Sequence, residues 1–131
     1  MAKLSKFLRS VDGGRIMFWC PGCNEAHQIT VRDGANHQGP GWGYNGNAEA
    51  PTFTPSILVR SVRTRGGEEE FDRILDTYKL PEEREKMLAD VRIAWVCHSF
   101  VTDGQIQFLG DCTHELAGQT VPLPPFEEEE D

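Results

Sequence analysis

The sequence predicts a small α+β protein, in which an antiparallel β-sheet of hairpins surrounds a zinc-binding turn and a helical hairpin is inserted beside it. Two turn signals predict the hairpins: a Cys-x-x-Cys segment at Cys20–Cys23, and Asp-Gly at residues 103 and 104, each between short apolar runs. A helical period of apolar residues between 68 and 92 predicts the helices. With 131 residues, 38% of them hydrophobic, the chain suits one domain with a small core.

The first hairpin is expected from strands at 16–19 and 27–31, which flank the Cys-x-x-Cys turn. Two thiolates on such a turn can both point at one Zn²⁺, about 2.3 Å from each sulfur. Asn24, directly after the second thiol, is one of the few non-glycine residues that accepts the left-handed conformation this turn needs. The segment therefore predicts a zinc knuckle, the name used below for residues 20–23.

The second hairpin is expected to turn at Asp103 and Gly104. A two-residue turn there places Cys97 opposite Gly110 and Cys112 one diagonal step further on. Because side chains on one face of a strand recur every second residue, both thiols share that face. A register slip of one residue would move Cys112 to the face of His98.

The predicted zinc ligands are the four cysteines of the chain: Cys20, Cys23, Cys97 and Cys112. His27, His98 or His114 could each replace Cys112. The first ten residues lack the apolar core of a secretory signal, and no apolar run reaches the length of a membrane span. We therefore expect an intracellular protein with reduced thiols, which favours metal over a disulfide. A thioredoxin-type redox site is disfavoured because a strand, not a helix, follows the turn.

Charge separates the chain into three parts. The formal net charge is -8, but residues 127–131 are all acidic, and residues 68–92 hold nine acids against five bases. The rest is almost neutral. We expect a single zinc-binding domain over residues 1–126 and a disordered acidic tail at 127–131. We do not expect nucleic acid as a partner of so acidic a chain, although arginines cluster near residue 63.

The insert, residues 64–92, is expected to form two helices. Phe71, Ile74, Leu75 and Tyr78 have the spacing of one helical face. Pro81 suits the first turn of a second helix. We expect the pair to cover a face of the sheet, with a partner-binding arm as the alternative.

Residues 39–56 are rich in glycine, proline and aromatic side chains. Such a segment predicts neither a helix nor a central strand, and we expect a loop, either anchored by Trp42, Tyr44 and Phe53 or flexible. Asn45, Asn47 and Glu49 are expected to cap turns within it rather than to bind a ligand.

Three polar residues near the predicted metal are candidate catalytic groups: His98, Asp111 and His114. A histidine base and a metal-activated water would make a hydrolytic site. The competing interpretation, which we favour, is that His98 forms hydrogen bonds in the core and that Asp111 caps a short turn from His114 to Ala117, closed by Gly118.

Two stretches, YNGNAEAPTFTPSI and CHSFVTDGQIQFLGDCTHELAGQTVPLP, closely resemble a family of small phage and prophage proteins of unknown function. The resemblance covers residues 15–60 and 93–124, and it matches the family's Cys-x-x-Cys and Cys-His pairs at Cys20, Cys23, Cys97 and His98. Members often carry the label "ammonia monooxygenase". That enzyme is a copper-containing membrane complex, and no segment of this chain could span a membrane.

The resemblance implies a phage or prophage accessory protein located in the host cytoplasm or in the virion. Together with the predicted zinc site, it favours a non-catalytic module that binds another protein, either a host factor or a virion component. The alternative is a metal-dependent hydrolase that uses His98, Asp111 or His114. Counting ligands distinguishes the two, because four protein ligands close a structural zinc, whereas a catalytic zinc keeps one position for water.

Overall fold

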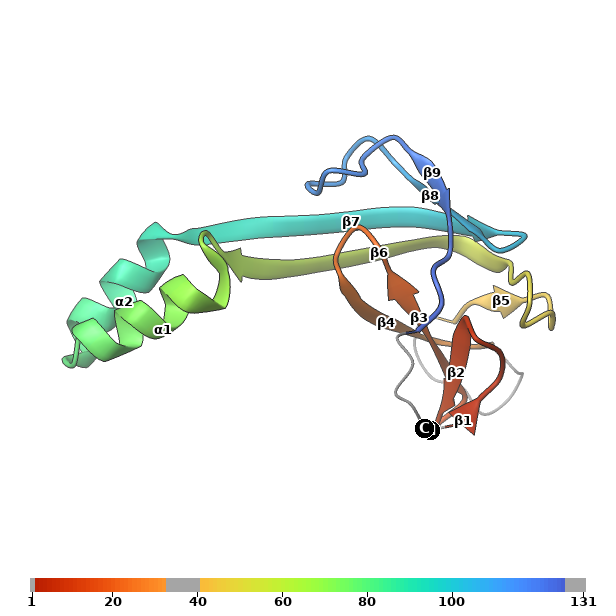
Figure 1. Ribbon diagram of the computed structural model, residues 1–131, viewed down its shortest axis with the longest axis horizontal. Helices are drawn as coiled ribbons and strands as arrows, with labels where there is room; N and C mark the ends of the chain where they lie inside the picture. Colours follow the sequence, from red (N-terminus) through yellow and green to blue (C-terminus); the bar gives the residue numbers. More distant parts are fainter. Residues whose placement is uncertain (1, 33–40, 127–131) are drawn as a thin grey trace. The chain divides into compact units, whose positions relative to one another are not determined.

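The computed structural model describes residues 2–32 and 41–126, and Figure 1 shows its strands and helices. It divides into two compact units: the first comprises Met1–Leu58 and Cys97–Asp131, and the second comprises Val59–Val96. The predicted acidic tail, 127–131, and the first two residues of the predicted loop, 39 and 40, lie outside the described residues. The predicted α+β class is confirmed, with the hairpins divided between two sheets of the first unit.

The first sheet has the order β1-β2-β3-β4, in which each strand pairs antiparallel with the next. Its strands are β1 (Ala2–Lys3), β2 (Leu8–Val11), β3 (Arg15–Cys20) and β4 (Glu25–Thr30). The pairing of Cys20 with Glu25 places the zinc knuckle in the β3–β4 turn. Asn24 has a φ of 57°, the left-handed conformation expected from the sequence.

The second sheet has the order β5-β6-β7-β8-β9. Its strands are β5 (Gly43–Tyr44), β6 (Phe53–Thr64), β7 (Arg92–Thr102), β8 (Gln105–Phe108) and β9 (Thr120–Pro122). Val101 pairs with Ile106 and Thr102 with Gln105, and both turn residues, Asp103 and Gly104, have positive φ. This is the register and the two-residue turn predicted from the sequence.

The predicted loop at 39–56 was wrong at its end, because Phe53–Ser56 belong to β6, an interior strand of the second sheet. Pro55 follows directly on Phe53 and Thr54, the two residues of β6 that pair with the short β5. Asn47 caps a turn as expected: its side-chain oxygen accepts from the backbone N–H of Glu49 at 3.1 Å.

The core of the first unit is built from alternate residues of these strands. In β8 the pattern is exposed, buried, exposed, buried, with Ile106 and Phe108 inward. Phe18 of β3 stacks on Phe53 of β6 at 6.0 Å between ring centroids, which joins the two sheets. The opposite face of β7 and β8 is left to polar and half-exposed side chains, among them His98.

The second unit contains the ends of β6 and β7 nearest the helices α1 (Gly67–Thr77) and α2 (Pro81–Asp90). The helical hairpin predicted from the sequence is confirmed, with Ile74 fully buried and Pro81 in the first turn of α2. Arg63 lies over the Trp95 ring, 4.2 Å from its centroid. Within the described parts of the chain, no helix has the length and apolar character to cross a membrane.

Candidate functional site

Four side chains of the first unit form a buried cluster with the composition of a metal site. Cys20, Cys23, His27 and Cys97 are all buried, and one ligand atom from each lies within 4.8 Å of the others. The Cys20 and Cys97 sulfurs are 3.8 Å apart. That is far longer than the roughly 2.05 Å of a disulfide. It matches the separation of about 3.8 Å between two thiolates that bind one tetrahedral metal ion at about 2.3 Å. The cluster can therefore hold a metal ion.

His27 completes the cluster from β4. Its Nε2 is buried and has no hydrogen-bond partner among the described residues, so a bound ion would satisfy an otherwise costly group. Burial disfavours a charged imidazole here, but the adjacent Cys20 and Cys23 thiols outweigh burial and raise the pKa of His27 to about 9. Hydrogen bonds with these same two thiols, together with burial, raise the pKa of the Cys97 thiol. In the absence of an ion the cluster retains protons, which a metal would displace.

A second group, Cys97, Cys112 and His114, shares one thiol with the first. The backbone N–H of Leu116 donates to His114 Nδ1 at 3.2 Å. A neutral imidazole that accepts at Nδ1 carries its proton on Nε2, so this histidine is suited to donate to a sulfur rather than to ligate a metal. Sequence reasoning had considered His114 both as a catalytic residue and as a ligand. The expected turn after it is present, closed by Gly118 at a φ of +81°.

The ring of His114 also packs on the knuckle itself. A Cβ at Gly22 would lie 2.3 Å from His114 Cε1, so only glycine fits there. On its other side the ring meets Phe108 edge-on, at 4.5 Å between centroids. His114 therefore joins the zinc knuckle to the β7–β8 hairpin.

Cys112, predicted as the fourth zinc ligand, is buried beside the backbone of His98. Its sulfur accepts from the His98 N–H at 3.2 Å and donates to the His98 carbonyl, also at 3.2 Å. A sulfur that donates a proton is a neutral thiol, whereas a metal ligand is a thiolate. In this arrangement Cys112 fixes the backbone of His98 by two hydrogen bonds.

The His98 side chain lies on the opposite face of β7 and bonds two other polar groups. Its Nε2 is 3.0 Å from Ser56 Oγ, and its Nδ1 is 3.1 Å from Asp111 Oδ2. With the proton on Nδ1, the ring donates to the Asp111 carboxylate and accepts from the Ser56 hydroxyl. This is the arrangement of nucleophile, base and orienting carboxylate found in Ser-His-Asp triads.

Three separate segments position this triad. Ser56 lies on β6, where the Trp42 indole N–H donates to its carbonyl at 3.2 Å, and β6 neighbours β7 in the sheet. Asp111 lies in the turn after β8. The sequence had singled out His98 and Asp111, and the structure brings these two together. Their partner Ser56 was missed, because no G-x-S-x-G or similar motif surrounds it.

The fold and the triad together define the class of protein: a small α+β chain with the side-chain arrangement of a serine hydrolase. The chain belongs to the BubE family, described as bacterial ubiquitination-like system serine protease, whose model matches residues 2–109. The match includes Ser56, His98 and the four residues of the metal cluster, and it ends just before Asp111. No curated protein and no solved structure gives a significant match to the chain.

Proposed function

We propose that this chain is a serine protease in which Ser56 is the nucleophile, His98 the general base and Asp111 the residue that orients it. One observation carries the proposal: a single imidazole bonds Ser56 Oγ through Nε2 and a carboxylate through Nδ1. The description of the BubE family supports the same class of reaction. A non-catalytic protein-binding module, favoured by the sequence alone, would not require this Ser-His-Asp arrangement.

The steps of peptide-bond hydrolysis follow from this Ser-His-Asp arrangement. His98 Nε2 takes the Ser56 hydroxyl proton as Oγ attacks the scissile carbonyl, and Asp111 stabilises the imidazolium that forms. The imidazolium then gives its proton to the leaving amine, which departs as the acyl-enzyme forms. A water molecule, deprotonated by the same imidazole, releases the acyl group and restores Ser56.

For the metal centre we propose a structural zinc held by Cys20, Cys23, His27 and Cys97. Mixed sulfur and nitrogen ligands are typical of zinc, and four protein ligands leave no position for a reactive water. The alternative, a metal-dependent hydrolase, is less well supported because His98 and Asp111 bond each other and Ser56. Zinc would instead fix the strand that carries His98.

The test of the triad is labelling with a fluorophosphonate probe, followed by intact-mass measurement. The wild-type chain should gain one adduct, on Ser56, and both Ser56→Ala and His98→Ala should abolish it. Ser61→Ala is a matched control, since Ser61 is an exposed serine on the same strand, and it should label normally. An unlabelled but folded wild-type protein would favour the non-catalytic binding module.

A further inference from the structure

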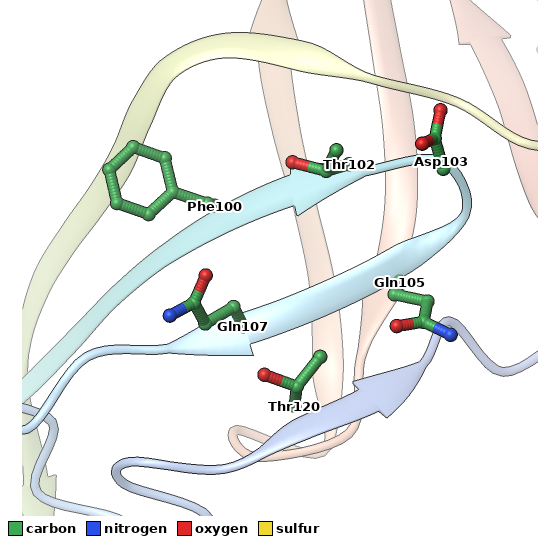
Figure 2. Close-up of a pocket in the computed structure, with 6 residues that line it drawn as sticks. All are labelled: Phe100, Thr102, Asp103, Gln105, Gln107 and Thr120. Carbon is green, nitrogen blue, oxygen red and sulfur yellow. The ribbon is translucent and has the colours of Figure 1, made fainter.

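A groove of about 440 Å³ crosses the outer face of the second sheet. Figure 2 shows its six lining side chains, which come from β7, β8, β9 and the turn between β7 and β8: Phe100, Thr102, Asp103, Gln105, Gln107 and Thr120. Phe100 and Gln107 lie at one end of the row, and Asp103 and Gln105 lie at the other. The triad uses none of these residues.

The groove begins next to the catalytic base. Exposure along β7 alternates, so His98, Phe100 and Thr102 share the outer face, while Ser99 and Val101 are buried. At about 3.3 Å per residue, Phe100 lies roughly 7 Å along the strand from His98. The Leu109 N–H donates to the His98 carbonyl at 2.9 Å, so the β7–β8 ladder continues from the groove to the triad. The groove and the His98 side chain therefore lie on the same face of β7.

The lining selects against some ligands and suits others. It contains no lysine, arginine or histidine, which disfavours phosphates and acidic peptides. Four of the six side chains are amides or hydroxyls, which can both donate to and accept from a peptide backbone. Phe100 is 39% exposed and offers an apolar surface close to the triad. Asp103 is the one charged residue of the lining, and its carboxylate is exposed, 3.5 Å from the Thr52 hydroxyl.

The geometry points to a substrate-recognition groove for an extended polypeptide. An apolar substrate side chain packs on Phe100, the amides of Gln105 and Gln107 bond the substrate backbone, and a lysine or arginine side chain reaches Asp103. Phe100 and Asp103 are three residues apart, about 10 Å of extended chain, and the side chains of an extended substrate face the same side only at every second residue, so the basic residue lies two or four positions from the apolar one. This inference rests on the proposed protease activity, which sets the orientation of the substrate along the groove. The apolar residue lies nearer the scissile bond than the basic residue does.

A binding experiment tests the groove without requiring turnover. The full chain carrying Ser56→Ala is applied to an array of synthetic octapeptides that vary one apolar and one basic position. We expect the tightest binding for an apolar residue with lysine or arginine two or four positions away. Adding Phe100→Ala should weaken these peptides about tenfold, the loss expected for one well-packed apolar contact. Adding Asp103→Asn should weaken them about threefold and remove their salt dependence, as for an exposed ion pair.

Matched controls come from α1. Phe71 is 38% exposed, almost the same as Phe100, and Asp72 is an exposed carboxylate, so Phe71→Ala and Asp72→Asn should leave the peptide preference unchanged. Absence of any preferred peptide, or a preference that survives both groove substitutions, would overturn the inference. If the fluorophosphonate labels Ser56 while the array fails, only the groove is wrong. If the array succeeds and Ser56 stays unlabelled, the groove binds peptides and the protease proposal falls.

Discussion

Cys97 and His98 are neighbours in the chain but belong to opposite faces of β7. Cys97 points inward, fully buried in a cluster of sulfur and nitrogen ligands, whereas the side chain of His98 is 25% exposed on the outer face. Asp111 and Cys112 repeat the arrangement after β8, with an exposed carboxylate next to a buried thiol. The comparison teaches that one short stretch of β7, residues 97 and 98, can serve the proposed metal centre on its inner face and the proposed triad on its outer face. Rigidity on one face therefore gives precise placement on the other.

The largest expected effect is from Cys20→Ser, which removes a ligand from the inner face. A structural zinc can contribute on the order of 10 kcal/mol, comparable to the whole net stability of a domain this size. We expect loss of the bound metal and cooperative unfolding, with Trp19 of β3 moving into water. Elemental analysis, expected to find about one zinc per wild-type chain, and thermal unfolding followed by tryptophan emission check this. A variant that stays folded without metal would show that the two faces are independent.

On the outer face, Asp111→Asn should lower kcat strongly and leave stability almost unchanged. The amide still fills the space, but it no longer favours the His98 tautomer that accepts from Ser56, an effect of about 10³- to 10⁴-fold in serine proteases. Kinetics on a cleaved octapeptide and a melting curve are the measurements. Equal damage to activity and melting temperature would mean that Asp111 supports the fold rather than the reaction.

Cys112 lies between the two faces, and Cys112→Ala separates its two possible roles. If His27 is the fourth ligand, the variant keeps its metal, while the two lost hydrogen bonds to the His98 backbone lower kcat by about tenfold. Cys112→Ser should recover part of the rate, because a hydroxyl can also donate to and accept from the His98 backbone. The recovery is partial because a hydroxyl reaches less far than a thiol. Loss of metal from Cys112→Ala, with retention in His27→Ala, would return Cys112 to the ligand set.

The smallest expected effect on activity is from Gly22→Ala, which acts on stability instead. The new Cβ would displace the His114 ring, at a cost of about 1 to 3 kcal/mol from overpacking. Metal content should hold while the melting temperature falls. The double variant Gly22→Ala with His114→Ala tests the cause, because removing the ring should relieve the added strain. If the double variant lost as much stability as the two single variants together, the contact between residue 22 and the His114 ring would be contradicted.

Much of this arrangement could be predicted from local signals. The knuckle turn and the Asp-Gly hairpin are short-range features, and the hairpin register correctly placed Cys97 and Cys112 on one buried face. Ser56 could not be found in the same way. Its role depends on β6 lying beside β7 and on a hydrogen bond between residues 42 positions apart. The proline before Ser56 argued against a strand, yet both residues belong to β6.

The path of the chain between Ser56 and His98 has a practical consequence. It leaves along β6, passes through two helices and returns along β7, while both triad residues belong to the unit without the helices. Because the entropy of closing a loop changes slowly with its length, this excursion can be lengthened, shortened or exchanged for another module without altering the register at its base. For a protein engineer it is a site for inserting a sensor or binding domain between the proposed nucleophile, Ser56, and its proposed base, His98.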